Sequence, residues 1–273
     1  MEKTRPYPLI SIVTVVWNNL DGLRLTATNV QNQDYVNIQH VIVDGASEDG
    51  TPEWLQGYNP IFDAKKISEP DDGLYDAMNK GLAMATGDLV VFLNGGDTFC
   101  DEKVLTYIAS EWSLGSWSWG YGGINYISSD RQYLSSYNLV PFQPRRVQLG
   151  LAYVPHPATF MSRDLLLELE GFRPEFGWSA DQELGVRAAL HSTPAVWPRP
   201  LTDFLVGGAH SQGSLRDVAE RYSRIRSQND LTVMRSPLAD RIFTASIGHY
   251  WTIRSWVSSR FKSRVGIDAA RSS

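Results

Sequence analysis

Residues 88–97 read DLVVFLNGGD, an apolar run that ends in an amide, two glycines and a carboxylate. An apolar run of this length, bounded by turn residues, is typical of a buried strand. The glycines let the backbone turn sharply and let a ligand approach it closely. Asp97 would then stand at the edge of a sheet, where a carboxylate can hold a hard cation that takes few protein ligands. The alternative is a plain turn, in which Asp97 caps a helix that begins near Asp101.

The residues before this segment alternate between strands and helices. The predicted order is strand 9–17, helix 19–33, strand 38–44, helix 51–55, strand 65–69 and helix 73–85. Such alternation with short connections predicts a parallel sheet with helices on both faces. Ligands bind these sheets beyond the carboxyl ends of the strands, which here are residues 17–19, 44–47 and 94–97.

The pattern changes after residue 100. The sequence predicts an antiparallel pair at 117–127 and 132–137, a helix at 177–189 and a strand at 201–206. From residue 214 to 261 the pattern is largely helical, with a break at Ser236 and Pro237.

The predicted fold class is therefore α/β, with a mostly parallel central sheet flanked by helices. A small antiparallel element and a helical C-terminal extension complete it. The predicted domains are residues 1–213, divided into halves at about 8–100 and 101–213, and residues 214–273.

The composition limits the classes of function. Residues 214–273 hold 11 Lys and Arg against 5 Asp and Glu, whereas the preceding residues hold 14 against 25. An acidic body is a poor nucleic-acid binder but suits a divalent cation. Cys100 is the single cysteine, which excludes an intramolecular disulfide framework and favours a cytoplasmic location. The apolar run at 9–17 is too short for a signal peptide or a membrane span, so neither is expected.

The segment 44–51, DGASEDGT, follows the second strand. A carboxylate at this place, Asp44, can accept a hydrogen bond from a base or a ribose hydroxyl. The alternative is a loop that leads into a helix, with Ser47 or Asp49 as the N-cap. The segment contains neither a Gly-x-Gly-x-x-Gly fingerprint nor a Walker-type Lys-Ser/Thr.

Taken together, the motifs follow a set order and spacing. They are SIVT at 11–14, VDGASEDGT at 43–51, DGLYDAMNKG at 72–81, ATGD at 85–88 and FLNGGD at 92–97. This order resembles the family 2 glycosyltransferases of the GT-A fold, especially bacterial enzymes of surface-polysaccharide and glycolipid assembly. The resemblance covers about residues 8–100 strongly and 150–210 loosely.

The resemblance implies a nucleoside-diphosphate sugar as donor and a hydroxyl of a saccharide or lipid-linked acceptor. It implies that Asp44 contacts the base or ribose, that Asp72 lies near the base, and that the same nucleotide site includes Val16, Asn18 and Asn94. Asp97 takes the metal position of the family's Asp-x-Asp motif, for Mn²⁺ or Mg²⁺, and His210 is a candidate second metal ligand. The chain departs from this motif, because Asn94 or Gly95 replaces its first acid.

Downstream, residues 178–184 (WSADQEL) look like the family's acidic motif at the start of a helix. By resemblance Asp181 is the general base, with Glu183 as the second choice, and a carboxylate near a helix N-terminus is held ionised by the helix dipole. His156 and Glu183 are candidate contacts to the acceptor or the diphosphate. The implied mechanism is a single displacement that inverts the anomeric configuration. The alternative is that Asp181 only caps the helix.

The tail at 242–265 places aromatic side chains among arginines and one lysine. A basic helix of this kind can lie on an anionic membrane surface, which predicts peripheral contact with the cytoplasmic face of the inner membrane. The alternative is a helix whose aromatics pack on the catalytic domain.

Two other functions stay open at this stage. A nucleotidyltransferase uses a similar sheet, but it carries a Lys- or Arg-bearing loop after the first strand, where this chain has Trp17, Asn18 and Asn19. The second open function is that of a non-catalytic relative that binds a nucleotide sugar. The chain lacks the Gln-x-x-Arg-Trp motif of processive synthases, so the enzyme is expected to be a hexosyltransferase that moves one sugar per encounter.

Overall fold

The strand β1 (Ile10–Val16) pairs in parallel with β2 (Ile38–Asp44) on one side and with β4 (Leu89–Phe92) on the other. At the edge, β3 (Asp63–Ser68) pairs in parallel with β2. Every residue of β1, β2 and β4 is buried, as expected for strands that are covered on both faces. The predicted parallel sheet is thus confirmed in this half of the fold. The structure is a computed structural model and describes residues 7–207 and 215–249.

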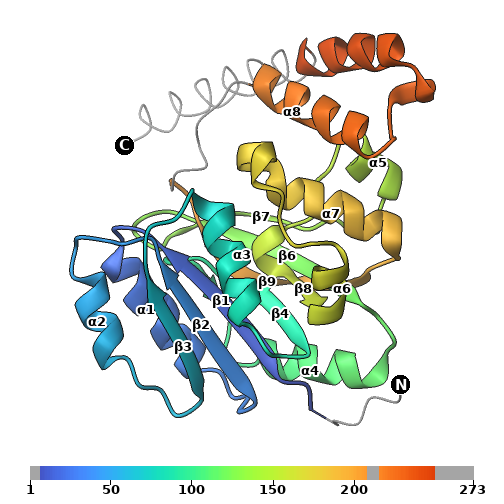
Figure 1. Cartoon of the computed structure of the whole chain (residues 1–273). Coiled ribbons are helices and arrows are strands. Elements are labelled where there is room, and N and C mark those ends of the chain that lie inside the picture. Colours follow the sequence, from blue (N-terminus) through green and yellow to red (C-terminus); the bar gives the residue numbers. More distant parts are fainter. Residues whose placement is uncertain (1–6, 208–214, 250–273) are drawn as a thin grey trace, which may run out of the picture. The chain divides into compact units, whose positions relative to one another are not determined.

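Helices cover both faces of this half-sheet (Figure 1). They are α1 (Leu20–Gln31), α2 (Thr51–Gly57), α3 (Leu74–Met84) and α4 (Val104–Leu114). Alternate side chains of β1 point to opposite faces. Ile12 belongs to the core that includes Val30 of α1 and α4 residues, whereas Val13 faces α3. A Cβ on Gly81 of α3 would lie 2.3 Å from Cγ1 of Val13, so this glycine allows α3 to pack closely on the sheet.

The second half of the sheet is mixed. Across the described residues the strand order is β3-β2-β1-β4-β8-β6-β9-β5, with β7 paired to β6. The added strands are β5 (Thr98–Phe99), β6 (Trp119–Ile127), β7 (Tyr133–Tyr137), β8 (Thr159–Ser162) and β9 (Ala195–Leu205). The predicted antiparallel pair is confirmed as β6 and β7. The last strand begins at Ala195 rather than at residue 201.

The remaining helices and 3₁₀ turns come after β7, β8 and β9 along the chain. They are α5 (Pro144–Gln148), α6 (Arg163–Glu168), α7 (Ala180–His191), α8 (Leu215–Gln228) and the 3₁₀ turns His156–Ala158, Pro174–Ser179 and Val233–Arg235. The predicted helix at 177–189 begins at Ala180, because Gly177 has a non-helical backbone with φ of 54°. None of the helices among the described residues is long and apolar enough to span a membrane.

The described residues divide into two compact units, residues 7–147 with 152–207 and residues 148–151 with 215–249. In the second unit, α8 is joined to a helix at 237–249 by a buried ion pair between Arg226 and Asp240, with 2.6 Å between Nε and Oδ1. The Arg226 guanidinium also donates to the carbonyl oxygen of Leu149 at 3.1 Å, so residues 148–151 belong to this unit. The predicted domain boundary at residue 213 lies outside the described residues.

His40 makes the stability of the sheet depend on pH. Its ring is fully buried in β2, with Nε2 3.0 Å from Oγ1 of Thr14 and Nδ1 2.9 Å from the hydroxyl of Tyr58. Burial lowers its pKa from 6.5 to about 3, so the folded protein keeps the imidazole neutral. Below pH 6.5 the unfolded chain binds a proton that the folded chain does not, and stability falls as the pH falls toward 3.

We therefore expect the free energy of unfolding in urea to fall by about 2 kcal/mol between pH 6.5 and pH 5, at about 1.4 kcal/mol per pH unit for this group. The variant His40→Gln should lose this part of the slope, since its amide does not titrate. Equal slopes for the two proteins would show that His40 does not control acid stability.

Candidate functional site

The carboxyl ends of β1, β2 and β4 meet at one edge of the sheet. The N–H of Gly45 donates to the carbonyl oxygen of Val16 at 3.0 Å, and the N–H of Gly95 donates to that of Val15 at 3.1 Å. Asn18, in a left-handed conformation with φ of 46°, ties the first two loops together. Its N–H donates to Oγ of Ser47 at 2.7 Å, and its Oδ1 accepts from the next residue of that loop at 2.9 Å. The structure thus brings the predicted residues Val16 and Asn18 to the edge where Asn94 begins its turn.

A threonine in the middle of α1 holds the turn at 94–97. The hydroxyl of Thr26 donates to the carbonyl oxygens of Asp97 at 2.8 Å and Asn94 at 3.2 Å, and it accepts from the N–H of Gly96 at 2.9 Å. Gly96 has φ of 107°, a conformation that favours glycine. The sequence analysis missed Thr26. The available signal was a polar side chain on the apolar stripe of α1, between Leu23 and Ala27, where it needs buried partners.

Asp97 is buried, with 4% of its surface exposed. Burial raises the pKa of its carboxyl to about 7, although a hydrogen bond from the N–H of Leu205 at 2.9 Å and the charge of Arg131 oppose this shift. Arg131 also donates to the carbonyl oxygen of Gly96 at 3.1 Å. The helix α4 begins at Val104 with Lys103 as its N-cap. Asp97 therefore does not cap it, so the capping role in the alternative is wrong, while its role at a metal site stays a prediction.

The turn fits a divalent cation. Oδ1 of Asn94 is buried and accepts no hydrogen bond from the described residues, and the carboxyl of Asp97 would regain its charge beside a cation. The described residues contain no group of three or more His, Cys, Asp or Glu side chains that could hold a metal. Asp97 and Asn94 would therefore supply one or two oxygen ligands, as is usual for a cation that shares its ligands with phosphates and water. His210 lies outside the described residues.

Asp44 is fully buried at the end of β2. Its Oδ2 accepts hydrogen bonds from Oγ of Ser68 at 2.6 Å and from the N–H of Ser47 at 3.1 Å, and its Oδ1 accepts from Oγ of Ser47. These bonds fix the loop after β2 and tie it to β3. The contact predicted between Asp44 and a nucleotide stays a prediction, since in this conformation the carboxylate accepts its hydrogen bonds from Ser47 and Ser68.

Two adjacent acids precede α3, and their environments differ. Asp72 is exposed, and its N–H donates to Oδ2 of Asp76 at 3.1 Å. Asp71, which the sequence analysis missed, points toward the edge of the sheet, because a Cβ on Gly45 would lie 2.6 Å from its Oδ2. The side chain of Trp17, which is 71% exposed, lies beside the same point. Position in the motif alone did not reveal which of the two acids faces the loops.

Asp181 lies in the first turn of α7 and is half-buried. Its Oδ1 accepts a hydrogen bond from the hydroxyl of Tyr75 at 3.1 Å, and its Oδ2 accepts one from Nε2 of Gln182 at 3.0 Å. Tyr75 belongs to the first turn of α3, directly after the loop with Asp71 and Asp72. The structure therefore brings the downstream acidic motif next to the helix that follows this loop.

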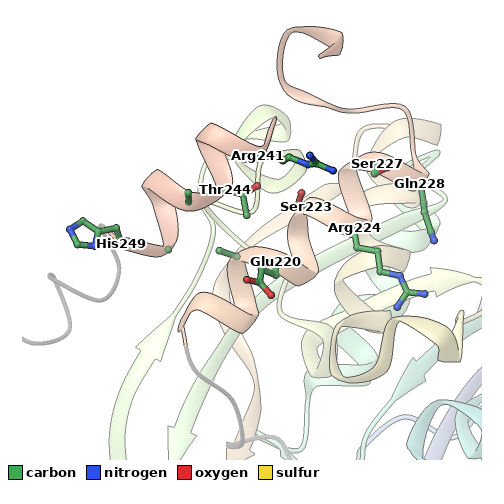
Figure 2. A pocket seen from close by; sticks show the side chains of 11 residues that line it. Glu220, Ser223, Arg224, Ser227, Gln228, Arg241, Thr244 and His249 are labelled. Carbon is green, nitrogen blue, oxygen red and sulfur yellow. The ribbon is translucent and has the colours of Figure 1, made fainter. Parts of the chain in front are cut away.

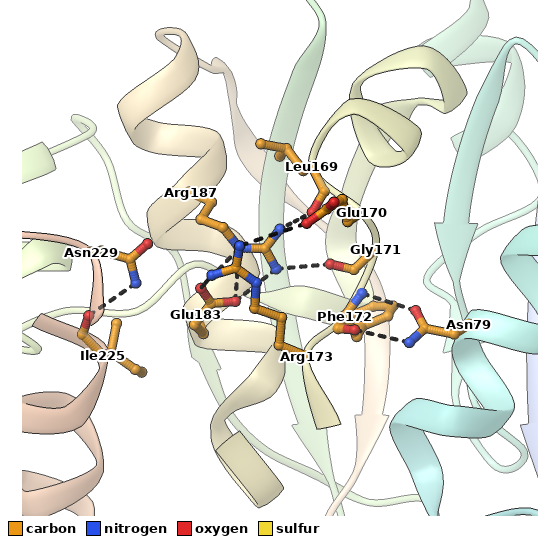
Figure 3. A network of polar contacts seen from close by, with 10 residues as sticks. All are labelled: Asn79, Leu169, Glu170, Gly171, Phe172, Arg173, Glu183, Arg187, Ile225 and Asn229. Carbon is orange, nitrogen blue, oxygen red and sulfur yellow. Dashed lines mark hydrogen bonds and ion pairs between the residues drawn. The ribbon is translucent and has the colours of Figure 1, made fainter. Parts of the chain in front are cut away.

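Glu183 has a different environment, drawn in Figure 3. It is 0% exposed, and both of its oxygens accept hydrogen bonds at 2.9 Å from Nε of Arg187. Nη1 of Arg173 lies 3.3 Å from its Oε1. Arg187 also donates to the carbonyl oxygens of Leu169 and Gly171. The prediction that Glu183 contacts the acceptor or the diphosphate is not supported, because its carboxylate is enclosed and its oxygens hold the two arginines.

His156 opens the 3₁₀ turn before β8. Its ring stacks on Phe92 at the end of β4, with 5.6 Å between centroids, and meets the edge of Phe172 at 5.4 Å. His156 is therefore next to the strand that leads into the turn at 94–97. Its contact with a ligand stays a prediction.

A groove lies in the second unit of the chain. This groove of about 830 Å³ runs between α8 and the helix at 237–249, and its labelled side chains include Glu220, Arg224 and Arg241 (Figure 2). Among the described residues, none of the site residues predicted from the sequence lines this groove. The candidate site is therefore the edge of the sheet and not this groove.

Comparison with known proteins places this geometry in context. Residues 11–168 match the family described as Glycosyl transferase family 2. The chain is 36% identical over 228 residues to an uncharacterized glycosyltransferase of Mycobacterium tuberculosis (strain ATCC 25618 / H37Rv), covering 82% of this chain and 84% of the relative. A shorter match, 33% over 99 residues, covers 36% of this chain and 39% of a Bacillus subtilis (strain 168) glycosyltransferase named for teichuronic acid biosynthesis.

Solved structures share the fold at low sequence identity. S. aureus TarS in complex with UDP-GlcNAc matches with a TM-score of 0.64 and 16% identity, covering 87% of this chain and 71% of that one. A mannosyltransferase from Pyrobaculum calidifontis in complex with GDP-Man and Mn²⁺ matches with a TM-score of 0.60 and 18% identity, covering 88% and 69%. Likeness at this identity supports the fold, which is the GT-A fold expected from the sequence.

Proposed function

The chain belongs to glycosyl transferase family 2, and from this premise we propose that it is an inverting, non-processive hexosyltransferase. It moves one sugar from a nucleoside-diphosphate sugar to a hydroxyl of a saccharide or glycolipid acceptor. The observation that carries the proposal is Asp97, a buried carboxyl with a raised pKa on the turn beside the ends of β1 and β4. A buried carboxyl of this kind is suited to a cation, which would restore the negative charge of the carboxyl and would also bind a diphosphate.

The donor binds at the shared edge of β1, β2 and β4. Its base lies against the loops of Asn18, Asp44 and Asp72, and Asp71 adds a carboxylate beside Gly45. The relatives in solved structures support a donor of this class, since their complexes contain UDP-GlcNAc in one case and GDP-Man in another. The side chain of Trp17, largely exposed at this edge, offers an apolar surface to the base.

Asp97 and Asn94 would hold a divalent cation, Mn²⁺ or Mg²⁺, which would supply positive charge to the departing nucleoside diphosphate. A complex with Mn²⁺ in one of the structural relatives supports this cofactor. His210 would add a ligand from outside the described residues.

Asp181 is the general base. Its two hydrogen bonds, from Tyr75 and Gln182, hold the carboxylate in one orientation while leaving it lone pairs for a proton. The acceptor hydroxyl gives its proton to this carboxylate, and its oxygen attacks the anomeric carbon opposite the leaving diphosphate. The C1–O bond to the diphosphate breaks as the new glycosidic bond forms, so the anomeric configuration inverts. His156 lies beside Phe92 and contacts the acceptor or the diphosphate from there.

The acceptor is proposed to be a saccharide or a lipid-linked saccharide, on the basis of a relative's name and of the basic tail. The relative named for teichuronic acid biosynthesis supports a role in polysaccharide assembly. The basic aromatic tail at 242–265, of which residues 250–265 lie outside the described residues, is proposed to touch the cytoplasmic face of the membrane, where lipid-linked acceptors are found. Family membership argues against a nucleotidyltransferase.

A thermal-shift screen tests this function. UDP, GDP and dTDP are compared with and without Mn²⁺ or Mg²⁺, with the metals alone as controls. At a ligand concentration of 100 Kd, one of the diphosphates with its metal should raise Tm by roughly 5 °C, from about 2.7 kcal/mol of added stability. The corresponding nucleoside monophosphate should give a smaller shift. If no diphosphate stabilises the protein with either metal, the proposed donor site is wrong.

A further inference from the structure

Two polar side chains of α3 point across to the segment that precedes and begins α7. Tyr75 and Asn79 are separated by one helical turn, so they share one face of α3. The hydroxyl of Tyr75 donates to Oδ1 of Asp181 at 3.1 Å. Asn79 binds both backbone groups of Phe172, donating from Nδ2 to the carbonyl oxygen and accepting from the N–H at Oδ1, each at 2.9 Å. The helix therefore contacts this region at two points.

The position of the Tyr75 hydroxyl is set by packing. Only 6% of this residue is exposed, and its ring lies 5.4 Å from the ring of Phe172, which in turn meets the ring of Phe92 at 4.8 Å. Gly171, with φ of 63°, lets the chain pass close to Asn79, because a Cβ there would lie 2.6 Å from Oδ1 of Asn79. Buried aromatic contacts and a doubly bonded backbone leave the hydroxyl little freedom.

The N-terminal end of α3, which carries Tyr75, also adjoins the donor side. Gly73 precedes α3 with φ of 107°, and its N–H donates to Oδ1 of Asp71 at 2.8 Å. Asp71 lies over Gly45 at the end of β2. The first turn of α3 thus joins a loop of the nucleotide side to the carboxylate of Asp181.

We infer that Tyr75 is a positioning residue for the general base, and that α3, through Tyr75 and Asn79, sets the place of Asp181 relative to the donor. The inference rests on the proposed function. Oδ1 of Asp181 is held by Tyr75 and Oδ2 by Gln182, so both ends of the carboxylate are fixed. Without the hydroxyl, the carboxylate rotates about its side-chain bonds and meets the acceptor hydroxyl in the right geometry less often.

The variant Tyr75→Phe tests this inference, because it keeps the ring and removes only the hydroxyl. We expect kcat for transfer to fall about tenfold, which corresponds to the loss of one hydrogen bond to a charged group. KM for the donor and its stabilisation by nucleoside diphosphate and metal should stay within about twofold of wild type. Tyr35→Phe is the matched control, since Tyr35 is also buried and donates to the carbonyl oxygen of Pro8 at 2.5 Å, away from the site. Its kcat should stay unchanged.

A double-mutant cycle separates positioning from general support of the fold. If Tyr75 acts through Asp181, adding Tyr75→Phe to Asp181→Asn should change the residual rate by less than about twofold. A full tenfold loss in both backgrounds would overturn the inference, as would an unchanged kcat in the single variant. Asn79→Ala gives a second measurement and should lower kcat without raising KM for the donor. Should Asp181→Asn itself keep full activity, the proposed base is wrong, a result distinct from a failure of Tyr75 alone.

Discussion

Replacing Asp97 by asparagine should abolish transfer and at the same time stabilise the ligand-free protein. The loss of rate should be about 10³-fold, because the diphosphate would leave without a properly held cation. Asparagine keeps the oxygen that accepts from Leu205, so the turn itself should persist. Stabilisation by nucleoside diphosphate and metal in the thermal-shift assay should also disappear.

The gain in stability follows from the buried carboxyl. The pKa of Asp97 is raised from 3.8 to about 7 in the folded protein, mainly by burial. A raised pKa means that the folded state holds a proton which the unfolded chain gives up above pH 3.8, so stability is lost as the pH rises toward 7. The largest possible loss is about 4 kcal/mol, because the pKa is shifted by about three units and each unit corresponds to about 1.4 kcal/mol. Replacing Asp97 by asparagine should therefore raise the free energy of unfolding by on the order of 2 kcal/mol at pH 7.5, and should change it very little at pH 4.

Urea unfolding of wild type and Asp97→Asn at these two pH values measures this effect. Asp101→Asn is the matched control, since Asp101 is exposed and pairs with Arg199 on the surface. It should leave transfer and the pH dependence unchanged. A variant at Asp97 that is inactive but less stable at pH 7.5 would indicate a structural role only, and one that is fully active would remove Asp97 from the metal site.

The parallel half of the fold could be predicted closely because each of its strands is buried on both faces. Such strands have continuous apolar sequences with polar ends, and β2 occupies the predicted residues 38–44. The strand β9 was harder to predict. Pro198 and Pro200 interrupt its pattern, and its register with β6 shifts between Tyr121 and Gly123, so the irregular part has no sequence alternation.

The site could be predicted in outline but not in the direction of each side chain. Asp181 and Glu183 both lie in the first turn of α7, and only the fold reveals that Arg187 and Arg173 enclose the second. In the same way, adjacent acids before α3 differ in which one reaches Gly45. Spacing along the chain gives the element that carries a residue, whereas packing with distant elements decides where its side chain points.

The variant Asp181→Asn should lower kcat for transfer by about 10³-fold, within the range of general-base catalysis. The amide keeps the shape of the side chain and can still accept from Tyr75, but it cannot take a proton. Donor binding should be retained, so the shift in Tm produced by nucleoside diphosphate and metal should match that of wild type.

Glu183, two residues after Asp181, is the control for this result. Glu183→Gln leaves Arg187 buried without its full countercharge, and breaking a buried ion pair typically costs 3–5 kcal/mol. This variant should therefore lose activity through a lower Tm, whereas Asp181→Asn should lose it at an unchanged Tm. Transfer assays and melting curves on both variants distinguish a proton acceptor from a structural acid two residues away. If Asp181→Asn transfers sugar at the wild-type rate, another group is the base.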